Sequence, residues 1–181
     1  IQGFFDIPVY YLTSRIVFAK DIKRRLGDKA YKNTVFVSPD AGGTMRARKF
    51  AEMFHGDIAI VDKRRPKAGK SEVMNIIGEV EGHHAILVDD IVDSGGTLCN
   101  AAQAIMDAGA LSVRAICTHP ILSGNAYNNI DNSKLTELIV TDSIPLISSN
   151  SKIKVLSCAD LFADVMKRVH NNESISSKFI M

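Results

Sequence analysis

The middle of the chain reads Ala85-Ile86-Leu87-Val88-Asp89-Asp90-Ile91-Val92-Asp93-Ser94-Gly95-Gly96-Thr97. Its first four residues are apolar, as in a strand buried on both faces, and a helical pattern begins at Thr97. The acidic residues and the glycine pair therefore lie between the carboxyl end of a strand and the beginning of a helix. This order is typical of an α/β fold that binds its ligand at one edge of the sheet.

Apolar runs of the same kind recur along the chain and alternate with helical patterns. The alternation predicts an α/β fold in which a parallel sheet is flanked by helices on both faces, as one domain over residues 1–181. We expect strands at 34–38, 57–61, 85–88, 113–117, 138–140 and 153–156, and helices at about 16–26, 44–54 and 97–108 and around 161–166.

Charge and composition restrict the possible partners. The chain has 22 basic and 20 acidic residues, so its net charge of +2 does not indicate nucleic acid or an anionic membrane as the main partner. It shows neither a signal peptide nor a run long enough to span a bilayer, and we expect a cytoplasmic protein. The widely spaced Cys99, Cys117 and Cys158 are interpreted as packing residues.

The stretch from Asp89 to Thr97 has the composition of a phosphate site with a sugar site beside it. Glycines before a helix let backbone N–H groups and the helix dipole meet a phosphate, and Ser94 and Thr97 add hydroxyl donors. Ionised Asp89 and Asp90 accept hydrogen bonds and suit the vicinal hydroxyls of ribose. The alternative is a helix cap and turn formed by Asp93, Ser94 and the glycines.

A second glycine turn, within residues 38–48, also follows an expected strand and opens an expected helix. Asp40 is placed as a hard oxygen ligand for Mg²⁺, and Arg46 or Arg48 can meet phosphate oxygens. A capped helix start remains the alternative for this segment.

The segment from Asp62 to Lys70 is dense in positive charge. Like charges at this density repel one another and favour a mobile loop that closes on an anion such as a polyphosphate. The alternative is a solvated surface. Its basic residues are Lys63, Arg64, Arg65, Lys67 and Lys70.

The histidines lack the spacing of metal ligands. His83 and His84 precede an expected strand and are interpreted as turn or surface residues. His119 follows the strand at 113–117, where a role in shaping the loop is favoured over catalysis.

These motifs carry a resemblance to a known family. The stretch 89–97 resembles the phosphoribosyl-binding signature of the type I phosphoribosyltransferase fold. At a finer level the chain resembles the C-terminal part of ribose-phosphate pyrophosphokinases, whose N-terminal half would precede Ile1. The similar segments are 3–8, 38–43, 62–66, 118–120 and 173–176, which together extend over nearly the whole chain.

The resemblance implies an activity. In that family the C1 hydroxyl of ribose 5-phosphate attacks the β-phosphorus of magnesium ATP, which yields phosphoribosyl pyrophosphate and AMP. The chain without its N-terminal half would be inactive. By position, Lys63 and Arg65 would be catalytic, Asp40 would help to hold Mg²⁺, Gly42, Gly43 and Arg46 would line the pyrophosphate side, and Asp89, Asp90, Asp93, Ser94, Gly95, Gly96 and Thr97 would bind ribose 5-phosphate.

The resemblance also implies regulation and assembly. Gln2, Ser174 and Ser176 match a regulatory phosphate site, although Tyr10 and Tyr11 stand where the family commonly has aspartate and asparagine. Family members form homo-oligomers, as dimers that assemble into hexamers. Residues 1–12 and 171–181 are expected to pack against the N-terminal half.

Two other functions use the same cradle. A nucleobase phosphoribosyltransferase would need a base-recognition hood, for which no segment of the sequence is a candidate. A non-catalytic regulatory subunit that binds phosphoribosyl ligands would not need Lys63 and Arg65, both of which are present.

Overall fold

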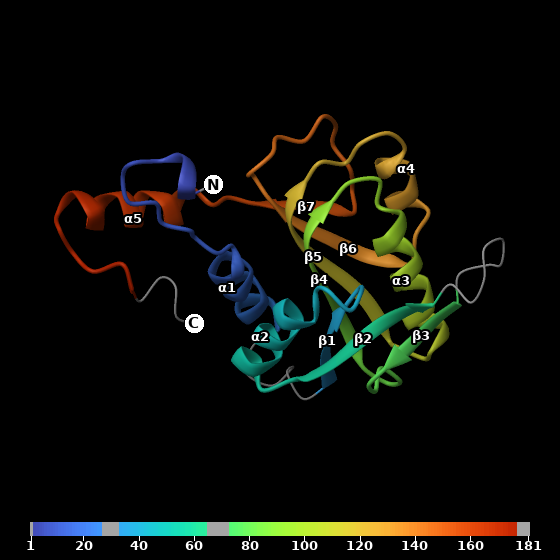
Figure 1. Ribbon diagram of the computed structural model, residues 1–181. Helices are drawn as coiled ribbons and strands as arrows, with labels where there is room; N and C mark the ends of the chain where they lie inside the picture. Colours follow the sequence, from blue (N-terminus) through green and yellow to red (C-terminus); the bar gives the residue numbers. More distant parts are fainter. Residues whose placement is uncertain (1, 27–32, 65–72, 177–181) are drawn as a thin grey trace.

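A computed structural model of the chain describes residues 2–26, 33–64 and 73–176. Within these residues, seven strands form one sheet in the order β3-β2-β1-β4-β5-β6-β7 (Figure 1). Every neighbouring pair is parallel except β2 and β3. The strands are β1 Thr34–Ser38, β2 Asp57–Arg64, β3 Val73–Ile77, β4 His84–Val92, β5 Ser112–Pro120, β6 Leu135–Thr141 and β7 Ile153–Leu156.

Helices cover both faces of the sheet, so the expected fold class is confirmed (Figure 1). The helices α1 and α2 pack on one face through a cluster that includes Phe18 and Phe50, and α3 and α4 pack on the other through Ile105 and Ile130. The helices are α1 Arg15–Leu26, α2 Thr44–Phe54, α3 Gly96–Asp107, α4 Ala126–Asp131 and α5 Ala159–His170, with a short 3-10 helix η1 at Gln2–Phe4.

Strand β1 shows why its sequence is apolar throughout. Successive side chains of a strand point to opposite faces, so Val35 and Val37 pack on one side and Phe36 on the other. The Phe36 ring stacks on Phe50 and Phe54 of α2, with ring centroids 5.9 and 5.6 Å apart. This packing holds the second half of α2 against β1.

The basic segment differs from its prediction. Strand β2 continues to Arg64 and pairs with the antiparallel strand β3, which places Lys63 opposite Met74. The prediction that Lys63 lies in a mobile loop is therefore wrong. The difference arises because the backbone of β2 pairs with β3 as far as Arg64. Arg65 and the remainder of the segment to Lys70 lie outside the described residues.

Two further strands are longer than expected. Strand β4 continues to Val92, so Asp89 and Asp90 lie in a strand and not in a loop. Strand β5 continues to Pro120 and therefore contains His119, whose Nδ1 is 2.9 Å from the Ser143 hydroxyl oxygen. The two strands pair over this added length, with Asp89 opposite Cys117 and Ile91 opposite His119. This pairing accounts for the extension.

The three cysteines behave as packing residues. Cys117 and Cys158 are buried, and the partly buried Cys99 packs against the core. Burial raises the pKa of each thiol, which disfavours the reactive thiolate.

The N-terminal segment and α5 both extend beyond the sheet (Figure 1). They expose large apolar side chains, among them Phe4, Ile7, Phe162 and Met166. Packing of residues 1–12 and 171–181 against a further part of the protein remains a prediction. No helix in the described residues is long and apolar enough to cross a membrane.

Candidate functional site

A cavity of about 310 Å³ lies at the carboxyl ends of β1 and β4, where a parallel sheet is expected to bind its ligand. It brings together the two glycine turns, which are separated by about fifty residues in the sequence. We call it the first cavity. Its lining includes Asp40, Arg46, Asp89, Asp90, Asp93, Ser94, Gly95, Gly96 and Thr97.

The amino end of α3 forms one wall of the first cavity. Gly95 has a φ of 75°, in the left-handed region that glycine adopts without strain, and α3 begins at the next residue. Among the described residues, no side-chain hydrogen bond caps this helix. Its first N–H groups are therefore available to an anion, which favours the phosphate site over the simple helix cap.

Side chains from α4 and from the segment that leads into it support this wall through hydrogen bonds. The Ser123 hydroxyl donates a hydrogen bond to the Asp93 carboxylate, and the Asn129 amide donates to the backbone oxygen of Ser94 at 2.9 Å. Ile130 lies beneath Gly95, 3.7 Å from where a side chain at that position would begin. The sequence interpretation missed Ser123 and Asn129. The polar run that follows strand β5 was the available signal, because it too lies at the carboxyl edge of the sheet.

Three charged side chains form the floor of the first cavity. Arg46 Nη2 of α2 lies 3.2 Å from Asp89 Oδ1, and the two terminal nitrogens of Arg46 contact both carboxylate oxygens of Asp90 at 3.1 Å. Arg46, which was expected on the pyrophosphate side, is therefore paired with the two aspartates expected to hold the sugar. This pairing partly neutralises two carboxylates next to a site for an anion.

Asp89 is the more buried of the two aspartates, with a side chain 16% exposed against 51% for Asp90. Burial raises the pKa of Asp89 to about 6, and the Asp90 carboxylate adds to the rise. The Asp90 backbone N–H, which donates to Asp89 Oδ1 at 2.9 Å, and the Arg46 charge act in the opposite direction. Near neutral pH Asp89 is largely ionised and can accept hydrogen bonds from hydroxyl groups.

The other wall is the turn between β1 and α2, and its own residues hold it together. The Ser38 hydroxyl donates to the Asp40 backbone oxygen at 2.6 Å, and Asp40 Oδ1 accepts the Gly43 N–H at 2.8 Å. A side chain at Gly43 would begin 2.7 Å from the Ser38 hydroxyl oxygen, so the turn has room only for glycine there. Gly42 is exposed beside it. Of this turn, Asp40 lines the cavity, whereas Gly42 and Gly43, which were expected on the pyrophosphate side, are not among the lining residues in the described structure.

The carboxylates fit a magnesium ion only in part. Among the described residues, no group of three or more His, Cys, Asp or Glu side chains could hold a metal ion. Magnesium is usually held by one or two carboxylates, with substrate phosphates and waters as the remaining ligands. Asp40 and Asp90 line the cavity and supply hard oxygen atoms. The donor set therefore fits an ion that arrives with phosphate groups.

Some predicted site residues are not gathered in the first cavity. Lys63 lies in the described part of β2 but is not among the residues that line the cavity. The Gln2 N–H donates to the Tyr11 hydroxyl at 3.0 Å, and the Ser174 hydroxyl donates to Ser176 at 3.2 Å. No hydrogen bond in the described part of the chain joins Gln2 to either serine, so the regulatory phosphate site remains a prediction.

Comparison with known proteins identifies relatives. The model of a family described as the phosphoribosyl synthetase-associated domain matches residues 63–180. Proteins named ribose-phosphate pyrophosphokinase from Bordetella parapertussis and Campylobacter jejuni are 53% and 54% identical to the chain over 182 and 180 residues, covering 99% of it and 57% of their own length. The crystal structure of phosphoribosylpyrophosphate synthetase from Mycobacterium smegmatis superposes with a TM-score of 0.83 at 32% identity, over 94% of this chain and 55% of that one. The chain thus spans a little over half the length of these relatives.

Proposed function

This chain belongs to the phosphoribosyl synthetase-associated domain family, and we propose that the full protein transfers pyrophosphate from ATP to ribose 5-phosphate. The resemblance to ribose-phosphate pyrophosphokinases identified from the motifs is confirmed at the level of the family. The names of the relatives support the assignment of this activity to the full protein.

One observation carries the proposal. Asp89 and Asp90 lie in the same cavity as the uncapped amino end of α3 and the glycine turn that contains Asp40. Carboxylates repel a free phosphate but accept hydrogen bonds from hydroxyl groups. A single ligand that carries both hydroxyl groups and a phosphate satisfies both parts of the cavity, and ribose 5-phosphate is such a ligand.

The proposed reaction uses this placement. Asp89, Asp90 and Asp93 hold the ribose hydroxyls while residues Ser94–Thr97 bind the 5-phosphate, which orients the C1 hydroxyl. Its oxygen forms a bond to the β-phosphorus of ATP, the bond from that phosphorus to the oxygen bridging the α-phosphorus breaks, and AMP leaves. The hydroxyl proton passes to solvent. Such a transfer depends on positioning and charge stabilisation more than on covalent help.

The pyrophosphate is proposed to lie against Gly42, Gly43 and Arg46, with Lys63 and Arg65 neutralising its developing charge. Magnesium, with Asp40 among its ligands, supplies further charge neutralisation when bound. Lys63 stands next to residues 65–72, which lie outside the described part of the chain, so the proposal for both basic residues rests on the family resemblance.

The test is an assay of the full protein with ATP, Mg²⁺ and ribose 5-phosphate that measures AMP and phosphoribosyl pyrophosphate. Lys63→Ala should lower turnover roughly 100- to 1,000-fold, the usual loss for one donor to a transition-state charge. Lys23→Ala, at an exposed position on α1, is the matched control. AMP formation by Lys63→Ala at the normal rate would contradict the role of Lys63.

Assays of the same full protein also distinguish the two alternative functions. Release of pyrophosphate from phosphoribosyl pyrophosphate on addition of a nucleobase, without ATP, would instead assign a nucleobase phosphoribosyltransferase. Binding of ribose 5-phosphate without any turnover would assign a regulatory subunit.

Residues 1–181 alone should be inactive in this assay. Assembly into dimer-based hexamers is a further proposal, and sedimentation measurements on the full protein test it.

A further inference from the structure

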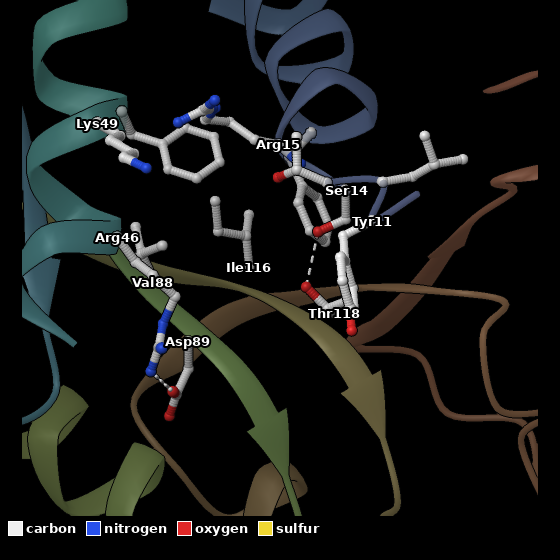
Figure 2. Close-up of a pocket in the computed structure, with 13 residues that line it drawn as sticks. Tyr11, Ser14, Arg15, Arg46, Lys49, Val88, Asp89, Ile116 and Thr118 are labelled. Carbon is white, nitrogen blue, oxygen red and sulfur yellow. Dashed lines mark hydrogen bonds and ion pairs between the residues drawn. The ribbon is translucent and has the colours of Figure 1, made fainter. Parts of the chain in front are cut away.

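A second cavity, of about 350 Å³, lies between α1 and α2 above the ends of β4 and β5 (Figure 2). We call it the second cavity. It is separate from the ribose-phosphate site, although Arg46 and Asp89 line both cavities and form their shared wall. The other residues that line the second cavity have no role in the proposed reaction.

The lining of the second cavity is cationic. Arg15 and Lys49 project from α1 and α2 on opposite sides of it, and Arg46 lies at the shared wall (Figure 2). Among the described residues of the lining, Asp89 is the only acidic one, and Arg46 already pairs with it. The Nε atom of Arg46 is buried and has no hydrogen-bond partner in the described part of the chain. A lining of this charge favours an anion.

The base of the second cavity is apolar. Phe18 and Phe50 of the two helices and Val88 and Ile116 of the sheet line it and are at most 5% exposed. Tyr11 stands at the cavity edge with about half of its surface exposed. Cationic groups above aromatic and aliphatic side chains suit a ligand with an anionic head and an apolar body, as in pockets for small molecules generally.

Polar atoms lie between the cationic groups and the apolar residues of the second cavity. The hydroxyl oxygens of Ser14 and Thr118 are 2.7 Å apart and join the beginning of α1 to β5 (Figure 2). One of the two hydroxyls donates to the other, so the second can still donate to an oxygen atom of a ligand. The pair thus adds a directional contact to the charges.

We propose that the second cavity binds an aromatic phosphate monoester, with the phosphate between Arg15 and Lys49 and the ring against Phe18, Phe50 and Ile116. A phosphate monoester fits because it carries close to two negative charges near neutral pH, and the lining holds more positive than negative groups. The volume of the cavity accommodates one ring and its phosphate. This site lies beyond the proposed reaction and does not depend on it.

The test is calorimetric titration of the full protein with phenyl phosphate in the presence of saturating ribose 5-phosphate, which occupies the first cavity. We expect saturable binding of one phenyl phosphate per chain. Lys49→Glu should weaken it by roughly tenfold or more, because a charge-assisted hydrogen bond is replaced by repulsion. The matched control is Arg48→Glu, which changes an exposed cation of the same helix that, in the described structure, lines neither cavity.

Three outcomes would overturn the proposal. The first is an absence of saturable binding, and the second is equal affinity in Lys49→Glu and Arg48→Glu. The third is binding of phenyl phosphate that is seen only when ribose 5-phosphate is left out, which would place the probe in the first cavity. Inorganic phosphate and phenol should each bind more weakly than phenyl phosphate, because each lacks one half of the ligand. The comparison of Lys49→Glu with Arg48→Glu can be made with or without ribose 5-phosphate, so failure here leaves the proposed reaction untouched, and failure of that reaction leaves this site untouched.

Discussion

The two glycine turns of the first cavity look alike in sequence, yet different parts of the molecule hold them. Each follows a buried strand, contains an aspartate and a glycine pair, and opens a helix. The turn between β1 and α2 is closed by its own residues, Ser38, Asp40 and Gly43. The turn between β4 and α3 is held by Ser123 and Asn129, which lie about thirty residues further along the chain.

The two turns therefore differ in whether the nearby aspartates stabilise the turn itself or face the ligand cavity. In the first turn the Asp40 carboxylate is used by a backbone N–H of the same turn. Before the second turn, at the end of β4, the carboxylates of Asp89 and Asp90 line the cavity, and their partner Arg46 comes from α2. The first turn should therefore tolerate little change in its own sequence, whereas the second should depend on distant residues.

The largest expected effect concerns the carboxylates. Asp89→Ala should weaken binding of ribose 5-phosphate roughly 100- to 1,000-fold, because a charged acceptor for sugar hydroxyls is lost. Calorimetry without nucleotide measures this. The comparator is Asp107→Ala, which removes an exposed carboxylate of α3 that does not line the cavity, so its affinity should stay within roughly threefold of the unmodified protein. Equal losses in the two variants would contradict the ligand-binding role of Asp89.

The second prediction uses the pKa of Asp89, about 6 in the folded protein against an ordinary value of 3.8. The folded state binds this proton more tightly than the unfolded state does. The resulting stability is fully present below about pH 4 and is lost as the pH rises through about 6. The free energy of unfolding should therefore fall by up to about 3 kcal/mol relative to Asp89→Asn over this range.

Urea unfolding of the two proteins at several pH values between 4 and 7 measures the difference. Asp89→Asn is the control because it keeps the shape of the side chain and removes its titration. Parallel stability curves for the two proteins would show that Asp89 is not perturbed by burial.

The third prediction concerns the glycines. Gly43→Ala should destabilise the protein by about 2 kcal/mol, because its methyl group would begin 2.7 Å from the Ser38 hydroxyl oxygen and break the turn. Gly95→Ala meets no described atom nearer than 3.7 Å, so its cost is the backbone strain at a φ of 75°, about 1 kcal/mol. Urea unfolding measures both.

Ser38→Ala in the Gly43→Ala background is the internal control. Removing the hydroxyl relieves the close contact, so the double variant should recover part of the stability. A larger cost for Gly95→Ala than for Gly43→Ala would reverse the assignment of the tighter turn.

The smallest expected effect comes from the distant support. Asn129→Ala removes the hydrogen bond to the Ser94 backbone oxygen, which is worth about 1 kcal/mol, so the KM for ribose 5-phosphate should rise roughly fivefold with kcat nearly unchanged. Steady-state kinetics of the full protein measures this. Asn132→Ala is the control, because the described hydrogen bonds of its side chain stay within the end of α4. A matching rise in KM for the control would remove the role of Asn129.

The elements that were not predicted from the sequence, or were predicted too short, have physical explanations. Strand β3 is short and antiparallel, and among the described residues it pairs with β2 alone, so its place at the edge depends on a neighbour that the local pattern does not identify. The six-residue helix α4 is too short and too polar to show a helical period. Strands β2, β4 and β5 are longer than their apolar runs because pairing with neighbours carries polar residues along.

The amino-acid sequence by itself determined the alternation of strands and helices, the two glycine turns and the family resemblance. Each of these depends on a few consecutive residues, through backbone preferences and local hydrogen bonds. Only the tertiary structure decided that Arg46 pairs with Asp89 and Asp90, that Ser123 and Asn129 support the phosphate wall, and that a second cavity opens between α1 and α2. These contacts join residues that are distant in sequence, and the strand order β1-β4-β5 brings them to one edge of the sheet.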